Sequence, residues 1–257
     1  MKPNAMKSKL LAGEPAFGVS VMIPSPQIVE MLGALGFDWV LIDCEHGTIS
    51  LETVELMAMA AEASGITPIA RPATGSAEHI LQVMDRGVLG VQVPHVCTAG
   101  DARRAVQAVK YHPQGRRGLA AGTRPSGYGF AGAMADYVAA ANRETLVCVQ
   151  LEDEEAVRNA EEILRVEGVD VFFIGPSDLS QSMGYPGDPK AAPVRDAIDA
   201  TLAKIRAAGK IPGFPGGADT VRAIQDKGAR YIYTHLPRLL ARGGSDFLTA
   251  ARAQSQE

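Results

Sequence analysis

Three apolar runs in the sequence end abruptly in polar residues that are able to do chemistry. The runs lie within residues 37–46, 145–149 and 171–174. The polar residues that end or follow them are Asp43, Glu45 and His46; Gln150 and Glu152; and Gly175, Pro176, Ser177 and Asp178. Buried parallel strands read as continuous apolar stretches, and enzymes built on them carry functional groups at the strand ends. The pattern therefore predicts an α/β enzyme.

Two of these strand ends carry carboxylates that suit a metal ion. Gln150 and Glu152 lie two positions apart, so both point to one face if the strand continues through them, and Asp178 approaches from the neighbouring loop. Two carboxylates with open positions for water and a chelating substrate suit Mg²⁺, Mn²⁺ or Co²⁺. Taken singly, Glu152 is equally explained as a cap of the next helix and Asp178 as a cap of a turn. Together they favour a metal site.

Three further strand ends carry Arg71, His95 and His235. Arg71 alone fits a pair with a loop carboxylate, and His46 alone fits a surface histidine or a satisfied core group as well as a catalytic role. Because all strands of a parallel barrel open on one face, convergence favours function for Arg71 and His46. His235 remains either a substrate contact or a loop residue.

Several other chemistries lack the residues that they need. None of the eight lysines lies at the end of a predicted strand, so a Schiff-base mechanism has no nucleophile. The sequence has no G-x-S-x-G turn of the kind that serine hydrolases use. Residues 127–132 match the G-x-G-x-x-G dinucleotide pattern, but no strand precedes them. We interpret that match as accidental.

Short runs rich in β-branched and aromatic residues alternate with amphipathic segments along the chain. They predict strands near residues 17–22, 38–43, 66–70, 90–93, 145–150, 170–174, 210–213 and 230–233. Helices are indicated by Ser25 before Pro26, an N-cap and a first-turn proline, and by two stripes at helical spacing. The stripes are Val54, Met57, Ala58 and Ala61, and Val194, Ile198, Leu202 and Ile205.

Eight such βα units predict a closed (β/α)₈ TIM barrel. The chain of 257 residues fits a single barrel domain, residues 1–257, with a long excursion at residues 111–144 that includes a helix near residues 132–142.

Composition narrows the partners and the compartment. The chain is 46% hydrophobic and 21% charged with a net charge of -4, which disfavours a nucleic-acid partner. Its start lacks the apolar stretch of a signal peptide, and no segment reaches the ~18 apolar residues of a membrane span. Three dispersed cysteines fit reduced thiols without a disulfide, so we expect a cytoplasmic protein with a small-molecule substrate and no membrane contact. We interpret the one basic concentration, Arg116, Arg117 and Arg124, as a solvated loop rather than a grip on phosphate or carboxylate.

Four stretches of the sequence carry a resemblance to a known family. They are residues 36–46, 71–72, 150–152 and 173–180. They resemble the signatures of the hydroxy-oxo-heptanedioate aldolases, class II metal-dependent pyruvate aldolases whose relatives include 2-keto-3-deoxy-rhamnonate and deoxy-ketoglucarate aldolases. The likeness covers almost the whole chain. It implies a lyase of aromatic or sugar acid breakdown on a barrel of the phosphoenolpyruvate/pyruvate type.

The resemblance implies a role for each matched residue. Glu152 and Asp178 would bind the metal, Arg71 and Gln150 would contact the keto acid, and His46 would serve as acid and base. Backbone of Gly175, Pro176 and Ser177 would receive the pyruvate carboxylate. These types suit retro-aldol cleavage, because a cation and a guanidinium stabilise the enolate that forms as the carbon–carbon bond breaks.

Asp85 resembles the family's partner to the catalytic histidine, yet it lies just before the fourth strand, at the opposite end of the barrel. We therefore expect Asp85, and also Arg124 in the excursion, to reach the site of a neighbouring subunit. Similar enzymes are hexamers, so the resemblance implies a homo-oligomer with shared active sites.

The sequence departs from the family pattern at residues 213–217 and 233–237, which border the open face. The aldehyde, and the choice of pyruvate or hydroxypyruvate as donor, stay open. One alternative function is an acyl-CoA lyase or decarboxylase that uses a pyruvate-like enolate, although acyl-CoA needs a basic exterior groove. Another is a non-catalytic keto-acid-binding barrel, against which stands the full set of Arg71, His46, Glu152 and Asp178.

Overall fold

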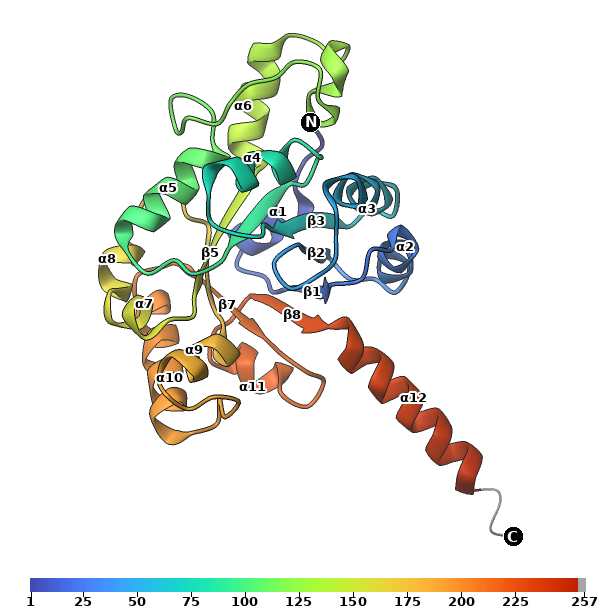
Figure 1. Cartoon of the computed structure of the whole chain (residues 1–257), viewed down its shortest axis with the longest axis vertical. Coiled ribbons are helices and arrows are strands. Elements are labelled where there is room, and N and C mark those ends of the chain that lie inside the picture. The colour runs from blue at the N-terminus through green and yellow to red at the C-terminus, as the bar shows by residue number, and fades with distance from the viewer. Residues whose placement is uncertain (254–257) are drawn as a thin grey trace.

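Eight parallel strands form a closed barrel in the computed structural model, which describes residues 1–253 (Figure 1). Each strand pairs with its neighbours in chain order, and β8 closes the barrel on β1. The strands are Ala16–Val21 (β1), Trp39–Asp43 (β2), Thr67–Arg71 (β3), Gly90–Val93 (β4), Leu146–Leu151 (β5), Val171–Ile174 (β6), Ile211–Pro215 (β7) and Tyr231–His235 (β8). All eight predicted strands are confirmed, with bounds that shift by two residues at most.

Helices follow each strand and surround the barrel (Figure 1). They are Ala5–Leu11 (α1), Pro26–Ala34 (α2), Leu51–Ala63 (α3), Ala77–Met84 (α4), Ala99–Val109 (α5), Met134–Glu144 (α6), Glu154–Arg158 (α7), Ala160–Leu164 (α8), Pro176–Ser182 (α9), Ala192–Ala207 (α10), Val221–Asp226 (α11) and Leu236–Ala253 (α12), with a 3₁₀ segment at Arg124–Gly129 (η1). The hydroxyl of Ser25 accepts the backbone N–H of Ile28, which confirms the predicted cap of α2. Both predicted helical stripes are buried.

Aromatic rings fill the interior of the barrel. Trp39 packs on Tyr231 with ring centroids 4.1 Å apart, and Phe173 stacks on Tyr233 at 5.0 Å. All four side chains are buried and belong to one apolar cluster inside the sheet. The barrel interior is therefore a packed core rather than a pore.

Helix α1 was missed by the sequence analysis. Its side chains Met6 and Leu10 join the interior cluster, so the helix covers one end of the barrel. The side chain of Asn4 accepts the backbone N–H of Lys7 and caps the helix. With two buried side chains in seven residues, α1 has too short an apolar stripe for a periodic signal, and its stability depends on tertiary packing.

The excursion at residues 111–144 contains η1 and α6. The interpretation of its basic residues as a solvated loop is wrong for Arg117. Arg117 is buried rather than solvated, and its Nη2 donates to Asp85 Oδ1 at 2.7 Å. Arg124 pairs with Glu62. The charges of Arg117 and Arg124 are thus matched by carboxylates that lie far away in the sequence, a pairing that local composition does not reveal.

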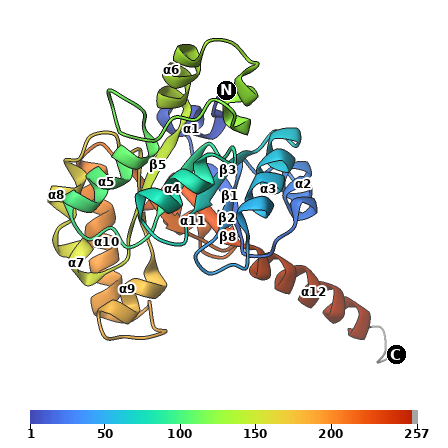
Figure 2. The same ribbon diagram turned by 45° about the horizontal axis from the view of Figure 1, so that its top comes forward.

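Helix α12 extends away from the body of the barrel in both views (Figures 1 and 2). It leaves large apolar side chains uncovered, with Leu240 63% and Phe247 72% exposed. Among the described residues, no helix combines the length and apolar character needed to cross a membrane.

Gly18 offers a test of the packed interior. A Cβ at this position would lie 2.4 Å from the indole ring of Trp39, so we expect Gly18→Ala to lower the free energy of unfolding by about 2–3 kcal/mol through overpacking. Gly122→Ala is the matched control, since a Cβ there meets nothing within 4 Å. Denaturant unfolding measures both. A loss for Gly18→Ala no greater than that of the control would contradict the packing described here.

Candidate active site

A buried ion pair joins the ends of β2 and β3. Arg71 Nε donates to Asp43 Oδ1 at 3.0 Å, and Arg71 Nη2 donates to Oδ2 at 2.5 Å. Asp43 Oδ1 also accepts the backbone N–H groups of Glu45 and His46, which fixes the turn after β2. Burial alone would lower the pKa of Arg71, but the hydrogen bonds and charge of Asp43 raise it. The guanidinium therefore stays charged at the mouth of the barrel.

A second buried group lies at the end of β5. Gln150 Nε2 donates to Glu152 Oε2, which confirms that both side chains point to the same face. Glu152 Oε1 accepts the backbone N–H of His95 at 2.9 Å, and Gln92 Nε2 donates to Gln150 Oε1 at 2.6 Å. The residue before α7 is Asp153, and Glu152 makes no bond to the first turn of that helix. The alternative reading of Glu152 as a helix cap is therefore wrong.

The carboxylate of Glu152 lies in an unfavourable position for a charge. Burial raises the pKa of Glu152 to about 7, the nearby charge of Asp178 adds to the rise, and the bonds to His95 and Gln150 oppose it. Gly175 allows this close packing: a Cβ at Gly175 would lie 2.6 Å from Glu152 Oε2. Residue 175 must be glycine for the chain after β6 to pass the carboxylate.

Helix α9 begins at this point and brings the remaining predicted residues. Gly175 is its N-cap, Pro176 and Ser177 open its first turn, and Asp178 lies in that turn. No three His, Cys, Asp or Glu residues within residues 1–253 are grouped to hold a metal. The two carboxylates that the sequence analysis named as metal ligands are those of Glu152 and Asp178. Two carboxylates with room for water and substrate oxygens fit a hard divalent ion.

Glu45 and His95 connect the Arg71–Asp43 pair to the Glu152 group. The sequence analysis assigned no role to either residue. Glu45 Oε2 lies 3.2 Å from Arg71 Nε, and its Oε1 lies 3.5 Å from His95 Nε2. His95 has φ 52°, a left-handed conformation that is uncommon outside glycine, and its Nδ1 lies 3.1 Å from Asp153 Oδ2. Burial alone would lower the pKa of His95. The hydrogen bond to Asp153 and the charges of Glu152 and Asp153 outweigh burial, so the pKa of His95 is raised. Position at a strand end was the only available signal for either residue.

His46 lies at the same mouth with its side chain 52% exposed. Its Nε2 is 3.7 Å from Glu45 Oε2. The exposure excludes the reading of His46 as a satisfied core histidine, and it leaves the ring free to meet a substrate.

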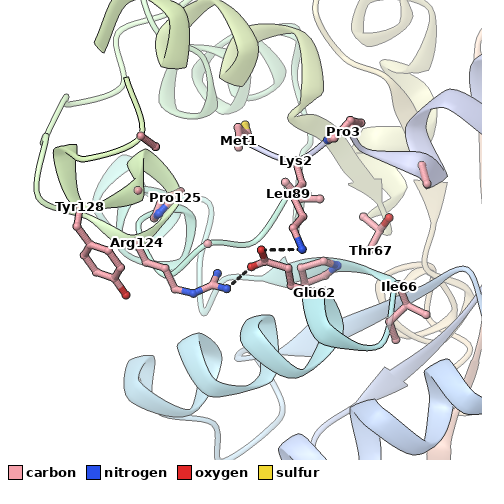
Figure 3. Close-up of a pocket in the computed structure, with 16 residues that line it drawn as sticks. Met1, Lys2, Pro3, Glu62, Ile66, Thr67, Leu89, Arg124, Pro125 and Tyr128 are labelled. Carbon is pink, nitrogen blue, oxygen red and sulfur yellow. Dashed lines mark hydrogen bonds and ion pairs between the residues drawn. The ribbon is translucent and has the colours of Figure 1, made fainter. Parts of the chain in front are cut away.

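Asp85 and Arg124 are not brought to this mouth within the chain. Asp85 ends α4 on the side where β4 begins, and it pairs with Arg117. Arg124 lines a cavity of about 520 Å³ beside Thr67, Leu89 and Glu62 (Figure 3). Because that cavity lies at the ends where the strands start, it is separate from the Glu152 carboxylate.

Comparison with known proteins shows what this constellation belongs to. Residues 17–234 match the HpcH/HpaI aldolase/citrate lyase family. The chain belongs to this family. It is 38% identical over 251 residues to a 4-hydroxy-2-oxo-heptane-1,7-dioate aldolase of Shigella flexneri, a match that covers 97% of this chain and 90% of the relative.

Two further similarities point the same way for this HpcH/HpaI family member. A hydroxypyruvate/pyruvate aldolase of Sagittula stellata is 36% identical, with coverage of 99% of this chain and 97% of the relative. The crystal structure of a family protein from Burkholderia cenocepacia superimposes with a TM-score of 0.91 at 29% identity and covers 97% and 99% of the two chains. The resemblance found in the sequence is confirmed, and the protein is an aldolase, a carbon–carbon lyase.

The raised pKa of Glu152 predicts a pH dependence of stability in the metal-free protein. The folded state binds a proton that the unfolded state releases near pH 4.5, so stability falls as the pH rises from about 4.5 to about 7. In chelator, the wild type should lose on the order of 2 kcal/mol across this window, and Glu152→Gln should lose much less. Urea unfolding at pH 5 and pH 8 measures the difference. Equal losses in the two proteins would show that Glu152 is not the group responsible.

Proposed function

We propose that this aldolase uses a divalent metal, Mg²⁺, Mn²⁺ or Co²⁺, to cleave 4-hydroxy-2-oxo acids to pyruvate or hydroxypyruvate and an aldehyde, and that it also catalyses the reverse. The observation that carries the proposal is the buried carboxylate of Glu152 beside Asp178, in the same mouth as the charged Arg71. The names of the two relatives support both donors. A cytoplasmic location is part of the proposal.

Glu152 and Asp178 would hold the metal in this proposal. When bound, the ion supplies a positive charge that stabilises the enolate of the keto acid. Its charge would also offset the burial that raises the pKa of Glu152. Gln150 would contact the keto acid from the same face of β5, and the backbone of Gly175, Pro176 and Ser177 would receive its carboxylate.

Arg71 and His46 would act on the reacting atoms. Arg71 is held by Asp43 at two points, so its guanidinium is preorganised to stabilise charge that develops on the keto oxygen. His46 is exposed enough to take the hydroxyl proton of the substrate as the carbon–carbon bond breaks, and to return it in the aldol direction.

The pairing of two basic residues with carboxylates argues against the acyl-CoA alternative. Arg117 is buried against Asp85, and Arg124 pairs with Glu62. Neither guanidinium is free to form the basic exterior groove that a CoA nucleotide needs. A small keto acid and a small aldehyde fit the mouth better.

A homo-oligomer with shared sites, such as the hexamer implied by the resemblance, is part of the proposal. The exposed apolar side chains of α12 support it, because a single chain leaves them in water. The outer surface beside β1 and β8 supports it as well, since Phe17, Phe37 and Ile232 line a shallow apolar cavity of about 290 Å³ there. In such an assembly Asp85, and Arg124 with it, would reach a neighbouring site.

Deuterium exchange tests the metal-dependent enolate step. Pyruvate in D₂O should lose its methyl proton signal in the presence of enzyme and Mg²⁺, and the loss should stop after chelation. Glu152→Gln and Asp178→Asn should slow the exchange by at least about 100-fold, whereas the exposed-site control Asp196→Asn should leave it unchanged. Proton NMR follows the signal. Exchange that survives chelation, or its absence from the wild type, would favour a different function.

Complementation tests the shared site. His46→Ala and Asp85→Ala should each be nearly inactive alone, because each removes one half of a site that two subunits form. Co-expression of the two variants should restore a measurable fraction of aldolase activity in mixed oligomers. Recovery of none, with mixed oligomers demonstrated by two affinity tags, would show that Asp85 does not serve a neighbour's site.

A further inference from the structure

His235 occupies the last position of β8 and faces the barrel mouth. Side chains of a strand alternate between faces, and Tyr231 and Tyr233, four and two residues earlier, belong to the interior cluster. The ring of His235 lies edge-on to Tyr233 with centroids 5.4 Å apart. His235 is half-buried, so it stands above the aromatic layer and reaches the open end of the barrel.

The two ring nitrogens of His235 differ in their surroundings. Nδ1 is buried and has no hydrogen-bond partner in the described part of the chain, whereas Nε2 is not among the buried atoms that lack a partner. A buried N–H without an acceptor is rarer in proteins than a buried acceptor without a donor. We therefore assign the proton to Nε2, which places an N–H donor on the open side of the ring.

The charges around His235 keep the ring neutral. Burial, then the cations Arg238 and Arg71, lower its pKa, and the charge of Asp43 opposes them only in part. His235 pairs in register with Ser20 of β1, and β1 lies between β8 and β2, the strand that leads to His46. A neutral N–H donor is suited to a neutral oxygen such as a hydroxyl.

We propose that His235 determines specificity by donating a hydrogen bond from Nε2 to a hydroxyl on the aldehyde, next to the reacting carbonyl, so that the enzyme prefers hydroxylated aldehydes to their apolar analogues. The inference rests on the proposed aldolase function. It assigns a substrate class to the β8 end of the mouth, and it gives His235 no part in bond cleavage.

A matched pair of aldehydes tests the assignment. Glycolaldehyde and propionaldehyde are similar in size and differ in the hydroxyl, so kcat/KM for each with pyruvate isolates that group. His235→Leu should lower the glycolaldehyde to propionaldehyde ratio by about tenfold, which is the usual weight of one hydrogen bond. His235→Asn keeps an N–H donor and should retain part of the preference. Thr234→Val alters the neighbour on the outer face and should leave the ratio unchanged.

The same variants separate this inference from the function on which it rests. Metal-dependent exchange of the pyruvate methyl protons needs no aldehyde, so it should be equal in the wild type and in His235→Leu. An unchanged ratio, an equal fall for both aldehydes, or an effect confined to a carboxylate-bearing aldehyde would overturn the assignment while exchange stays intact. A wild type without exchange would overturn the aldolase function itself, and the assignment with it.

Discussion

The burial of one carboxylate constrains the rest of this site. Glu152 lies at the end of β5 beside the charge of Asp178, where burial raises its pKa to about 7. The backbone N–H of His95 and the side-chain amide of Gln150 donate hydrogen bonds to the Glu152 carboxylate. Gly175, which has no side chain, leaves space for this carboxylate. The His95 ring adds a positive charge when it is protonated, since its Nδ1 lies 3.6 Å from Glu152 Oε1. In the proposed function, a bound cation would further favour the ionised form of Glu152.

The mouth has a closed half and an open half. In the closed half, Arg71 and Asp43 satisfy each other at two points and leave a fixed guanidinium. In the open half lie the carboxyl groups of Glu152 and Asp178, and the charge of Asp178 contributes to the raised pKa of Glu152. Glu45 and His95 join the two halves, and the left-handed backbone of His95 places its N–H on Glu152. Strain at this residue is thus used to hold the carboxylate.

Sequence reasoning predicted the barrel because the apolar runs are short, continuous and regularly interrupted, a local pattern that survives folding. It also placed Gln150 and Glu152 on one face, because the two-residue period of a strand leaves no other arrangement. Sequence reasoning failed where contacts between distant residues determine the structure. It predicted a solvated Arg117, but this side chain is buried against Asp85. It missed α1, which is stabilised by packing against the barrel interior. The roles of Glu45 and His95 depend on contacts between the ends of four strands, β2 to β5, and a single sequence does not reveal those contacts.

Binding of Mn²⁺ to the chelator-treated protein is the most direct test of the central claim, and water-proton relaxation measures it without turnover. The account predicts one Mn²⁺ per chain, with affinity that falls at least about tenfold in both Glu152→Gln and Asp178→Asn. Asp196→Asn removes an exposed carboxylate of α10 and should bind within about twofold of the wild type. Undiminished binding in Glu152→Gln or Asp178→Asn would contradict a cation held by these two carboxylates.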